Sequence, residues 1–147
     1  MDDITAQASK LIAAGPAAIW EALTTPRLIK PYFFGADVES SFEPGSPIRF
    51  RGEFKGQAYE DKGEILEVQP ARRLRMSHWS PLAGTPDAPE HYHVVTWDLQ
   101  PEGAGTRVTL TQSNLTGGVR PSDIAQRAEF EKNWKKVLDG LEKVVTA

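Results

Sequence analysis

The chain has 147 residues, of which 39% are hydrophobic and 25% are charged, and it contains no cysteine. This composition is typical of one ordinary globular domain, and we expect residues 1–147 to form a single domain. Without cysteine, the chain has no disulfides, thiolate metal sites or cysteine nucleophiles. The formal net charge of −3 at pH 7 gives no general attraction to nucleic acid or to anionic membranes.

The N-terminal segment opens with two aspartates and mixed residues, not with a basic region followed by an apolar run. No window of the sequence approaches the roughly 18 consecutive apolar residues of a membrane-spanning helix. These features predict a cytoplasmic protein that does not insert into membranes.

Prolines mark the elements at the start of the chain. Residues 4–13 alternate in character and predict a strand. Pro16 suits the first turn of a helix, and Pro26 begins a second, brief helix. That second helix ends early, because Pro31 cannot continue it.

From residue 36 onward the apolar pattern has the period of two that is typical of strands. Turn residues divide this region, and the widest irregular stretch is the loop 81–90. The predicted strands cover residues 36–42, 48–54, 58–68, 74–80, 91–100 and 106–115.

A long amphipathic helix is predicted at the end of the chain. It should start near Pro121, with Ser122 as its cap and Asp123 in its first turn. Its apolar positions recur every three or four residues and form one stripe that must lie on the sheet. The stripe consists of Phe130, Trp134, Val137, Leu138, Leu141, Val144 and Val145.

Several short motifs follow one another along the chain: residues 16–20, 23–26, 63–70 with Leu74 soon after, 105–110, and then Trp134, Leu138 and Leu141. These motifs and the order of the elements resemble the START-like (SRPBCC) superfamily, and within it the bacterial relatives of the activator of heat-shock protein 90 ATPase. The resemblance implies an α+β helix-grip fold. In this fold a seven-stranded antiparallel sheet wraps around a long C-terminal helix, with two short helices between strands 1 and 2, often leaving a hydrophobic cavity.

Strand parity indicates which side chains face the predicted helix. Val95, Trp97, Leu99, Val108 and Leu110 cannot all face water, so the same parity turns His91 and His93 inward, and Leu74 and Met76 turn His78 inward. A regular register then places Leu74 opposite Trp97, His78 opposite His93, and Asn114 beside His93.

We interpret this row as the polar end of a ligand pocket. Its polar residues would be His78, His93 and Asn114, and its apolar walls Met76, Trp97, Phe130 and Trp134. The alternative is that the imidazoles bond to each other, to backbone or to water and have a structural role.

Neither a metal nor a catalytic centre is predicted. Two histidines and an asparagine need a further ligand to hold a metal, so we expect no metal and no cofactor. No serine or lysine is placed as a nucleophile, and we name no catalytic residue. An acid turned inward beside the histidines would favour an enzyme, and a bulge could turn in either Glu60 or Asp61.

The opposite parity sends Trp79 and Tyr92 to the outer face, with Leu115 as their neighbour. This aromatic patch stabilises the strands or forms an interface with a second copy or with a chaperone. We favour a small-molecule binding protein that encloses a hydrophobic or amphipathic ligand. The alternatives are an interaction module of the chaperone ATPase activator type, and a cyclase-like or hydrolytic enzyme that uses the histidines.

Overall fold

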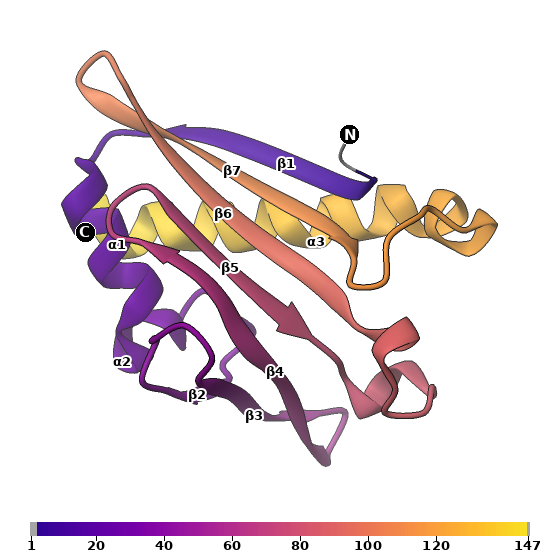
Figure 1. Ribbon diagram of the computed structural model, residues 1–147. Helices are drawn as coiled ribbons and strands as arrows, with labels where there is room; N and C mark the ends of the chain where they lie inside the picture. Colours follow the sequence, from indigo (N-terminus) through magenta and orange to yellow (C-terminus); the bar gives the residue numbers. More distant parts are fainter. Residues whose placement is uncertain (1–2, 147) are drawn as a thin grey trace.

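In the computed structural model, which describes residues 3–146, one antiparallel sheet curves over a long helix (Figure 1). The seven strands are ordered β1-β7-β6-β5-β4-β3-β2. The elements are β1 (Ile4–Ile12), α1 (Pro16–Thr24), α2 (Pro26–Ile29), β2 (Asp37–Ser40), β3 (Pro47–Phe54), β4 (Gln57–Gln69), β5 (Arg73–His78), the 3-10 helices η1 (Pro81–Ala83) and η2 (Pro89–His91), β6 (His93–Glu102), β7 (Gly105–Asn114) and α3 (Pro121–Thr146).

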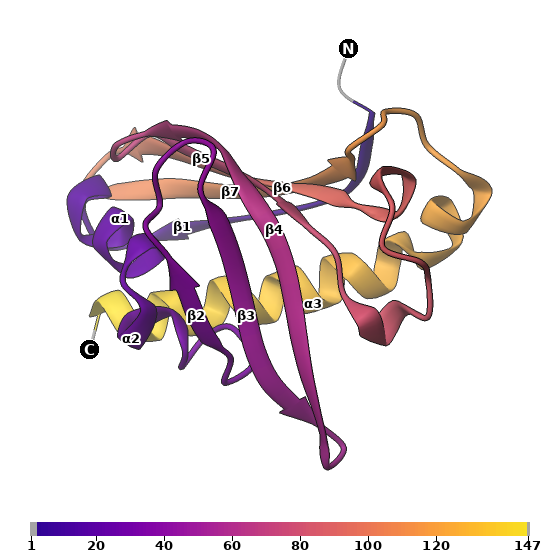
Figure 2. The same cartoon turned by 60° about the horizontal axis from the view of Figure 1, so that its bottom comes forward.

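The predicted α+β helix-grip architecture is therefore confirmed, including the two short helices after the first strand. In the turned view, α3 runs beneath the sheet, and the β3–β4 hairpin extends past it (Figure 2). None of the helices in residues 3–146 is both long and apolar enough to cross a membrane.

The core lies between α3 and the concave face of the sheet. Val137, Leu138 and Leu141 of α3 are almost fully buried there, together with Trp97 and Leu110 of the sheet. Burying an aliphatic side chain of this size contributes about 1.5–3 kcal/mol. The apolar stripe thus packs α3 against the concave face of the sheet.

A β-bulge in β4 changes which residues of that strand face inward. The pairing of β4 with β5 shifts register between Ile65 and Glu67, so β4 has one extra residue there. As a result, Ile65 is buried in the core and Val68 also packs against it, although they are three residues apart. Before the bulge, the parity of Ile65 turns Asp61 inward, and Asp61 is buried.

The predicted strand 36–42 is too long at its end. β2 stops at Ser40, and the Phe42 backbone N–H donates to the Ser40 hydroxyl at 3.0 Å. Phe42 has a φ of 56° and packs against the core from outside the strand. The local side-chain bond competes with continued strand pairing.

The predicted cap of the last helix is wrong. α3 begins at Pro121, so Ser122 lies inside the helix and is exposed. The Asp123 carboxylate caps this end instead, because its Oδ2 accepts from the Arg120 backbone N–H and from the Asn114 side chain, each at 2.8 Å. Because proline occupies the first helical position, the cap position is Arg120, directly before Pro121.

Candidate functional site

The predicted register of the central strands is confirmed. Leu74 pairs with Trp97, His78 with His93, and His93 with Asn114. The side chains of the polar row nevertheless have separate partners. His78 bonds Asp61, the His93 ring lies edge-on to Phe130 at 5.9 Å, and Asn114 bonds Asp123 and the Gly118 carbonyl.

A small cavity lies between the sheet, the two short helices and α3. Its volume is about 20 Å³, which is room for about one water molecule. Of the residues predicted for a pocket, His78, Met76, Trp97 and Trp134 line it, whereas His93, Phe130 and Asn114 do not. The complete lining is Leu23, Ile29, Tyr32, Phe33, Phe42, Ile48, Phe50, Met76, His78, Val95, Trp97 and Trp134.

His78 forms the polar edge of this cavity and bonds the buried Asp61, which does not itself line the cavity. His78 Nε2 and Asp61 Oδ2 are 3.0 Å apart, and only 8% of Asp61 is exposed. The other carboxylate oxygen, Asp61 Oδ1, is buried and has no hydrogen-bond partner in the described part of the chain. Buried polar atoms are nearly always bonded, so an unpartnered carboxylate oxygen needs an explanation.

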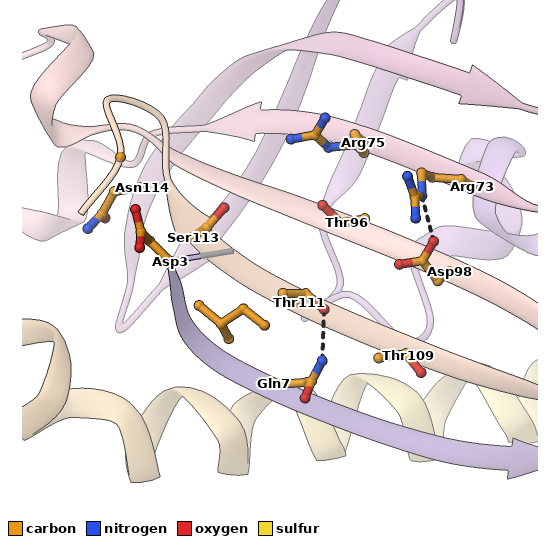
Figure 3. Close-up of a pocket in the computed structure, with 12 residues that line it drawn as sticks. Asp3, Gln7, Arg73, Arg75, Thr96, Asp98, Thr109, Thr111, Ser113 and Asn114 are labelled. Atoms are coloured by element: carbon orange, nitrogen blue, oxygen red, sulfur yellow. Dashed lines mark hydrogen bonds and ion pairs between the residues drawn. The ribbon is translucent and has the colours of Figure 1, made fainter. Parts of the chain in front are cut away.

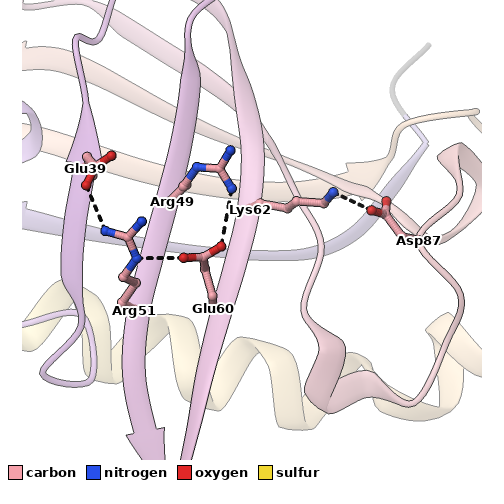
Figure 4. Close-up of polar contacts among 6 residues, drawn as sticks. All are labelled: Glu39, Arg49, Arg51, Glu60, Lys62 and Asp87. Carbon is pink, nitrogen blue, oxygen red and sulfur yellow. Dashed lines mark hydrogen bonds and ion pairs between the residues drawn. The ribbon is translucent and has the colours of Figure 1, made fainter.

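The structure distinguishes between the two acids that the sequence left open. Glu60 points outward and accepts from Arg51 at 2.6 Å and from Arg49 at 3.3 Å, within a charged network on the outer face (Figure 4). The hydrogen bond from Arg51 is the main cause that lowers the pKa of Glu60. Asp61 is therefore the acid on the inner face.

The cavity wall is mostly aromatic. The Phe33 ring is stacked on Phe50, with 5.1 Å between centroids, and lies 6.3 Å from the Trp134 ring. The Tyr32 hydroxyl donates to the Ala22 carbonyl at 2.8 Å, and Trp134 Nε1 donates to Gln112. The polar atoms of these two rings are thus satisfied, which leaves Asp61 Oδ1 as the unmet acceptor near the cavity.

Sequence reasoning missed the part that the turn after α2 plays in this wall. Tyr32 and Phe33 fall outside the predicted strands, so strand parity assigned them no direction, and Phe42 was placed in the predicted strand 36–42, whereas β2 ends at Ser40. The aromatic residues that directly follow Pro31 are the sequence signal that could have identified Tyr32 and Phe33, because apolar rings in a short turn need a surface to pack against.

His93 lies in a separate open hollow at the start of α3, with a volume of about 510 Å³. His91, Arg120 and Phe130 also line this hollow. Burial lowers the pKa of His93 below 6.5, and the neighbouring His78 and Arg120 lower it further, against an opposing effect of Asp123.

This lowered pKa predicts a loss of stability in acid. Between about pH 7.5 and about pH 5 the unfolded chain gains a proton at His93 more readily than the folded protein, so the free energy of unfolding should fall as the pH falls. A His93→Gln variant should lose less stability over this range, as measured by urea denaturation at each pH. Equal losses in the two proteins would show that His93 does not contribute.

The outer face of the central strands carries a polar hollow (Figure 3). Gln7 bonds Thr111 at 3.3 Å there, and Arg73 bonds Asp98 at 2.6 Å. This surface lies on the opposite side of the sheet from the cavity, as strand alternation requires. Within residues 3–146 no group of three or more His, Asp or Glu side chains is arranged to hold a metal ion.

The aromatic patch predicted for the outer face is present. The Trp79 and Tyr92 rings are stacked with 6.3 Å between centroids, and the Leu115 N–H donates to the Tyr92 carbonyl at 3.0 Å. The Tyr92 hydroxyl donates to Asp87 at 2.6 Å, and Lys62 forms an ion pair with the same carboxylate (Figure 4).

The sheet gripping a C-terminal helix places this protein in the START-like class. A family model described as "Activator of Hsp90 ATPase homolog 1-like protein" matches residues 13–146, and the chain belongs to this family.

Among solved structures, the chain is similar to ChR145 from Cytophaga hutchinsonii, with 43% identity, a TM-score of 0.78, and 96% of this chain and 92% of that chain covered. It is similar in fold to MLL2253 from Mesorhizobium loti, with 23% identity, a TM-score of 0.73, and 95% of each chain covered. A third structure is the Aha1 dimer from Colwellia psychrerythraea, with 20% identity, a TM-score of 0.70, and 95% of this chain and 94% of that chain covered. No curated protein matches the sequence.

Proposed function

We propose that this protein binds a small hydrophobic or amphipathic molecule between the sheet and α3, with Asp61 and His78 at the polar end of the site. The family and the fold support a ligand-binding or Hsp90-activator-like module. The observation that carries the choice of ligand binding is the buried, unpartnered Oδ1 of Asp61, whose carboxylate bonds the cavity-lining His78. Ligand sites of this kind combine apolar walls with a few placed polar groups.

The cavity must widen to admit such a ligand, because about 20 Å³ holds no more than one water molecule. Phe33, Phe42 and Trp134 are only half-buried, so they form the side of the cavity that faces solvent. These three residues, and not the fully buried core, are the part of the wall that moves in this proposal.

Native mass spectrometry of the purified protein tests the proposal. We expect a discrete non-covalent adduct on the wild-type chain, and its loss in His78→Phe, because the substitution removes the polar edge of the cavity. His91→Phe is the matched control, since His91 lies in the other hollow, and it should keep the adduct. An adduct that survives His78→Phe, or no adduct even after incubation with a cell extract, would count against the proposal.

A chaperone-activating interaction module is the second candidate, and the family match favours it. The Colwellia relative is described as a dimer, and the patch of Trp79, Tyr92 and Leu115 offers a surface of a suitable kind. If this patch is an interface, Trp79→Glu should lower the sedimentation coefficient or abolish partner capture while the chain remains folded. Unchanged sedimentation together with unchanged partners would leave the patch with a role in strand stabilisation alone.

Asp61 is an acid turned inward beside a histidine, which is the feature that would favour an enzyme. A carboxylate that orients an imidazole is one part of a general-base arrangement, which still needs a positioned substrate or a nucleophile. Within the described residues no serine, threonine or lysine side chain bonds to His78. We therefore assign Asp61 and His78 to ligand binding in this proposal.

A further inference from the structure

One ring of the cavity wall comes from a surface turn and not from the sheet or α3. Phe33 lies in the turn between α2 and β2, and its ring occupies a slot between Phe50 of β3 and Trp134 of α3. The stacking on Phe50 has an interplanar angle of 27°, which is a favourable arrangement for two aromatic rings. The slot therefore has the shape and chemistry of a site for one flat ring.

The turn that carries Phe33 is held by local contacts. Its backbone hydrogen bonds join it to itself and to the end of α2: Phe33 N–H donates to Ile29 O at 2.9 Å, and Ala36 N–H donates to Phe33 O at 3.0 Å. Phe34 is 58% exposed with a φ of 54°, and Gly35 follows with a φ of 73°. The Phe33 ring can leave the slot without breaking any pairing of the sheet.

Tyr32 fixes the other end of this turn. Its hydroxyl bonds Ala22, and its backbone lies so close to α3 that a Cβ at Gly140 would be 3.1 Å from the Tyr32 Cα. Tyr32 is buried whereas Phe33 is half-buried, so the anchored and the displaceable rings are adjacent in sequence. Movement of Phe33 thus leaves the contact of Tyr32 with α3 in place.

Asp61 determines which polar group a ligand in this slot must carry. Asp61 is the cross-strand partner of Phe50 and bonds His78, whose ring lies 5.5 Å from the Phe50 ring between centroids, so Asp61 shares the inner face of the sheet with the Phe50 wall of the slot. A carboxylate oxygen accepts hydrogen bonds, and Oδ1 has no donor within residues 3–146. A molecule that satisfies it must donate.

We infer that Phe33 occupies the place of a ligand's aromatic ring, and that the ligand is a planar aromatic molecule with a hydroxyl or amino group donating to Asp61. This inference rests on the proposed ligand-binding function and narrows it to the phenol and arylamine class. Phe33 closes the slot in the free protein, and the ligand ring replaces it against Phe50 and Trp134.

Phenol and toluene test the inference, because they have the same ring and similar size but only phenol donates a hydrogen bond. Each is titrated into the 15N-labelled protein, and binding is followed by the indole N–H resonances of Trp97 and Trp134. Phenol should bind at least about tenfold more tightly than toluene, since a hydrogen bond to a charged group has this magnitude. Aniline in place of phenol tests the arylamines, and it should likewise bind more tightly than toluene.

Two variants separate the parts of the inference. Asp61→Leu should abolish the preference for phenol while toluene still binds, and Phe33→Ala should tighten phenol binding about tenfold because no ring competes for the slot. Phe54→Ala is the matched control, since its ring is exposed and does not line the cavity, and it should bind like the wild type.

Equal binding of phenol and toluene by the wild type would overturn the inference, as would equal effects of Phe33→Ala and Phe54→Ala. The wild-type comparison stands even if Asp61→Leu fails to fold. 1-Octanol distinguishes this failure from failure of the proposed function. If 1-octanol shifts the cavity resonances and phenol has no preference over toluene, only the aromatic class is wrong; if none of these molecules binds, both proposals are wrong.

Discussion

Replacing Gly63 with alanine should lower the free energy of unfolding by about 3 kcal/mol, at the upper end of the usual cost of overpacking. A Cβ at this position would lie 1.7 Å from the Ser77 carbonyl oxygen and 2.6 Å from the Ser77 carbonyl carbon. Because both atoms belong to the backbone of β5, no side-chain rotation relieves the contact. Urea denaturation followed by circular dichroism measures the change.

Gly15→Ala is the matched control for this prediction. A Cβ there meets no atom within 4 Å, and the φ of Gly15 is −75°, which alanine adopts readily. Its stability should change by less than about 1 kcal/mol. If Gly63→Ala is as stable as this control, β4 and β5 can move apart at this point at little cost, and the prediction is wrong.

Replacing Asp123 with alanine should lower the free energy of unfolding by about 2–4 kcal/mol, because it removes two charge-assisted hydrogen bonds at a buried site. Asp123 Oδ2 accepts from both the Arg120 backbone and the Asn114 side chain at 2.8 Å, so it joins the start of α3 to the end of β7. Thermal and urea unfolding measure the loss, and native hydrogen exchange should show fraying in the first turns of α3.

Ser122→Ala separates the two assignments of the cap. Ser122 is exposed one residue before Asp123, and its substitution should change stability by no more than about 0.5 kcal/mol. If Ser122→Ala costs as much as Asp123→Ala, the serine cap expected from the sequence would be the correct assignment.

Most of the fold was predictable because it depends on local patterns. Alternation in the central strands predicted the pairs Leu74 with Trp97 and His78 with His93, and both pairs are present. Proline positions predicted the starts of the two short helices, at Pro16 and Pro26. These features follow from the period of two in strands and from the restricted φ of proline.

The candidate site was predictable only in part. His78, Met76, Trp97 and Trp134 line the cavity as the sequence predicted, because they lie on regular elements with a known inward face. His93 and Asn114 share the predicted row, but their side chains contact α3 or the segment before it. Strand register aligns His78, His93 and Asn114 across the sheet. The bonding partner of each side chain depends instead on the residues of other elements that pack against it.

The sequence by itself determined the α+β class of the fold, the order of its elements along the chain and the inward direction of His78, because each follows from periodicity and turn residues along short stretches of chain. Only the tertiary structure decided that Asp61 bonds His78 and that Phe33 fills the slot beside Phe50. One extra residue in β4 reverses the direction of every side chain before it, and no local pattern fixes where that residue falls. The position of Phe33 likewise depends on α3, which lies about a hundred residues away along the chain and is brought to it by folding.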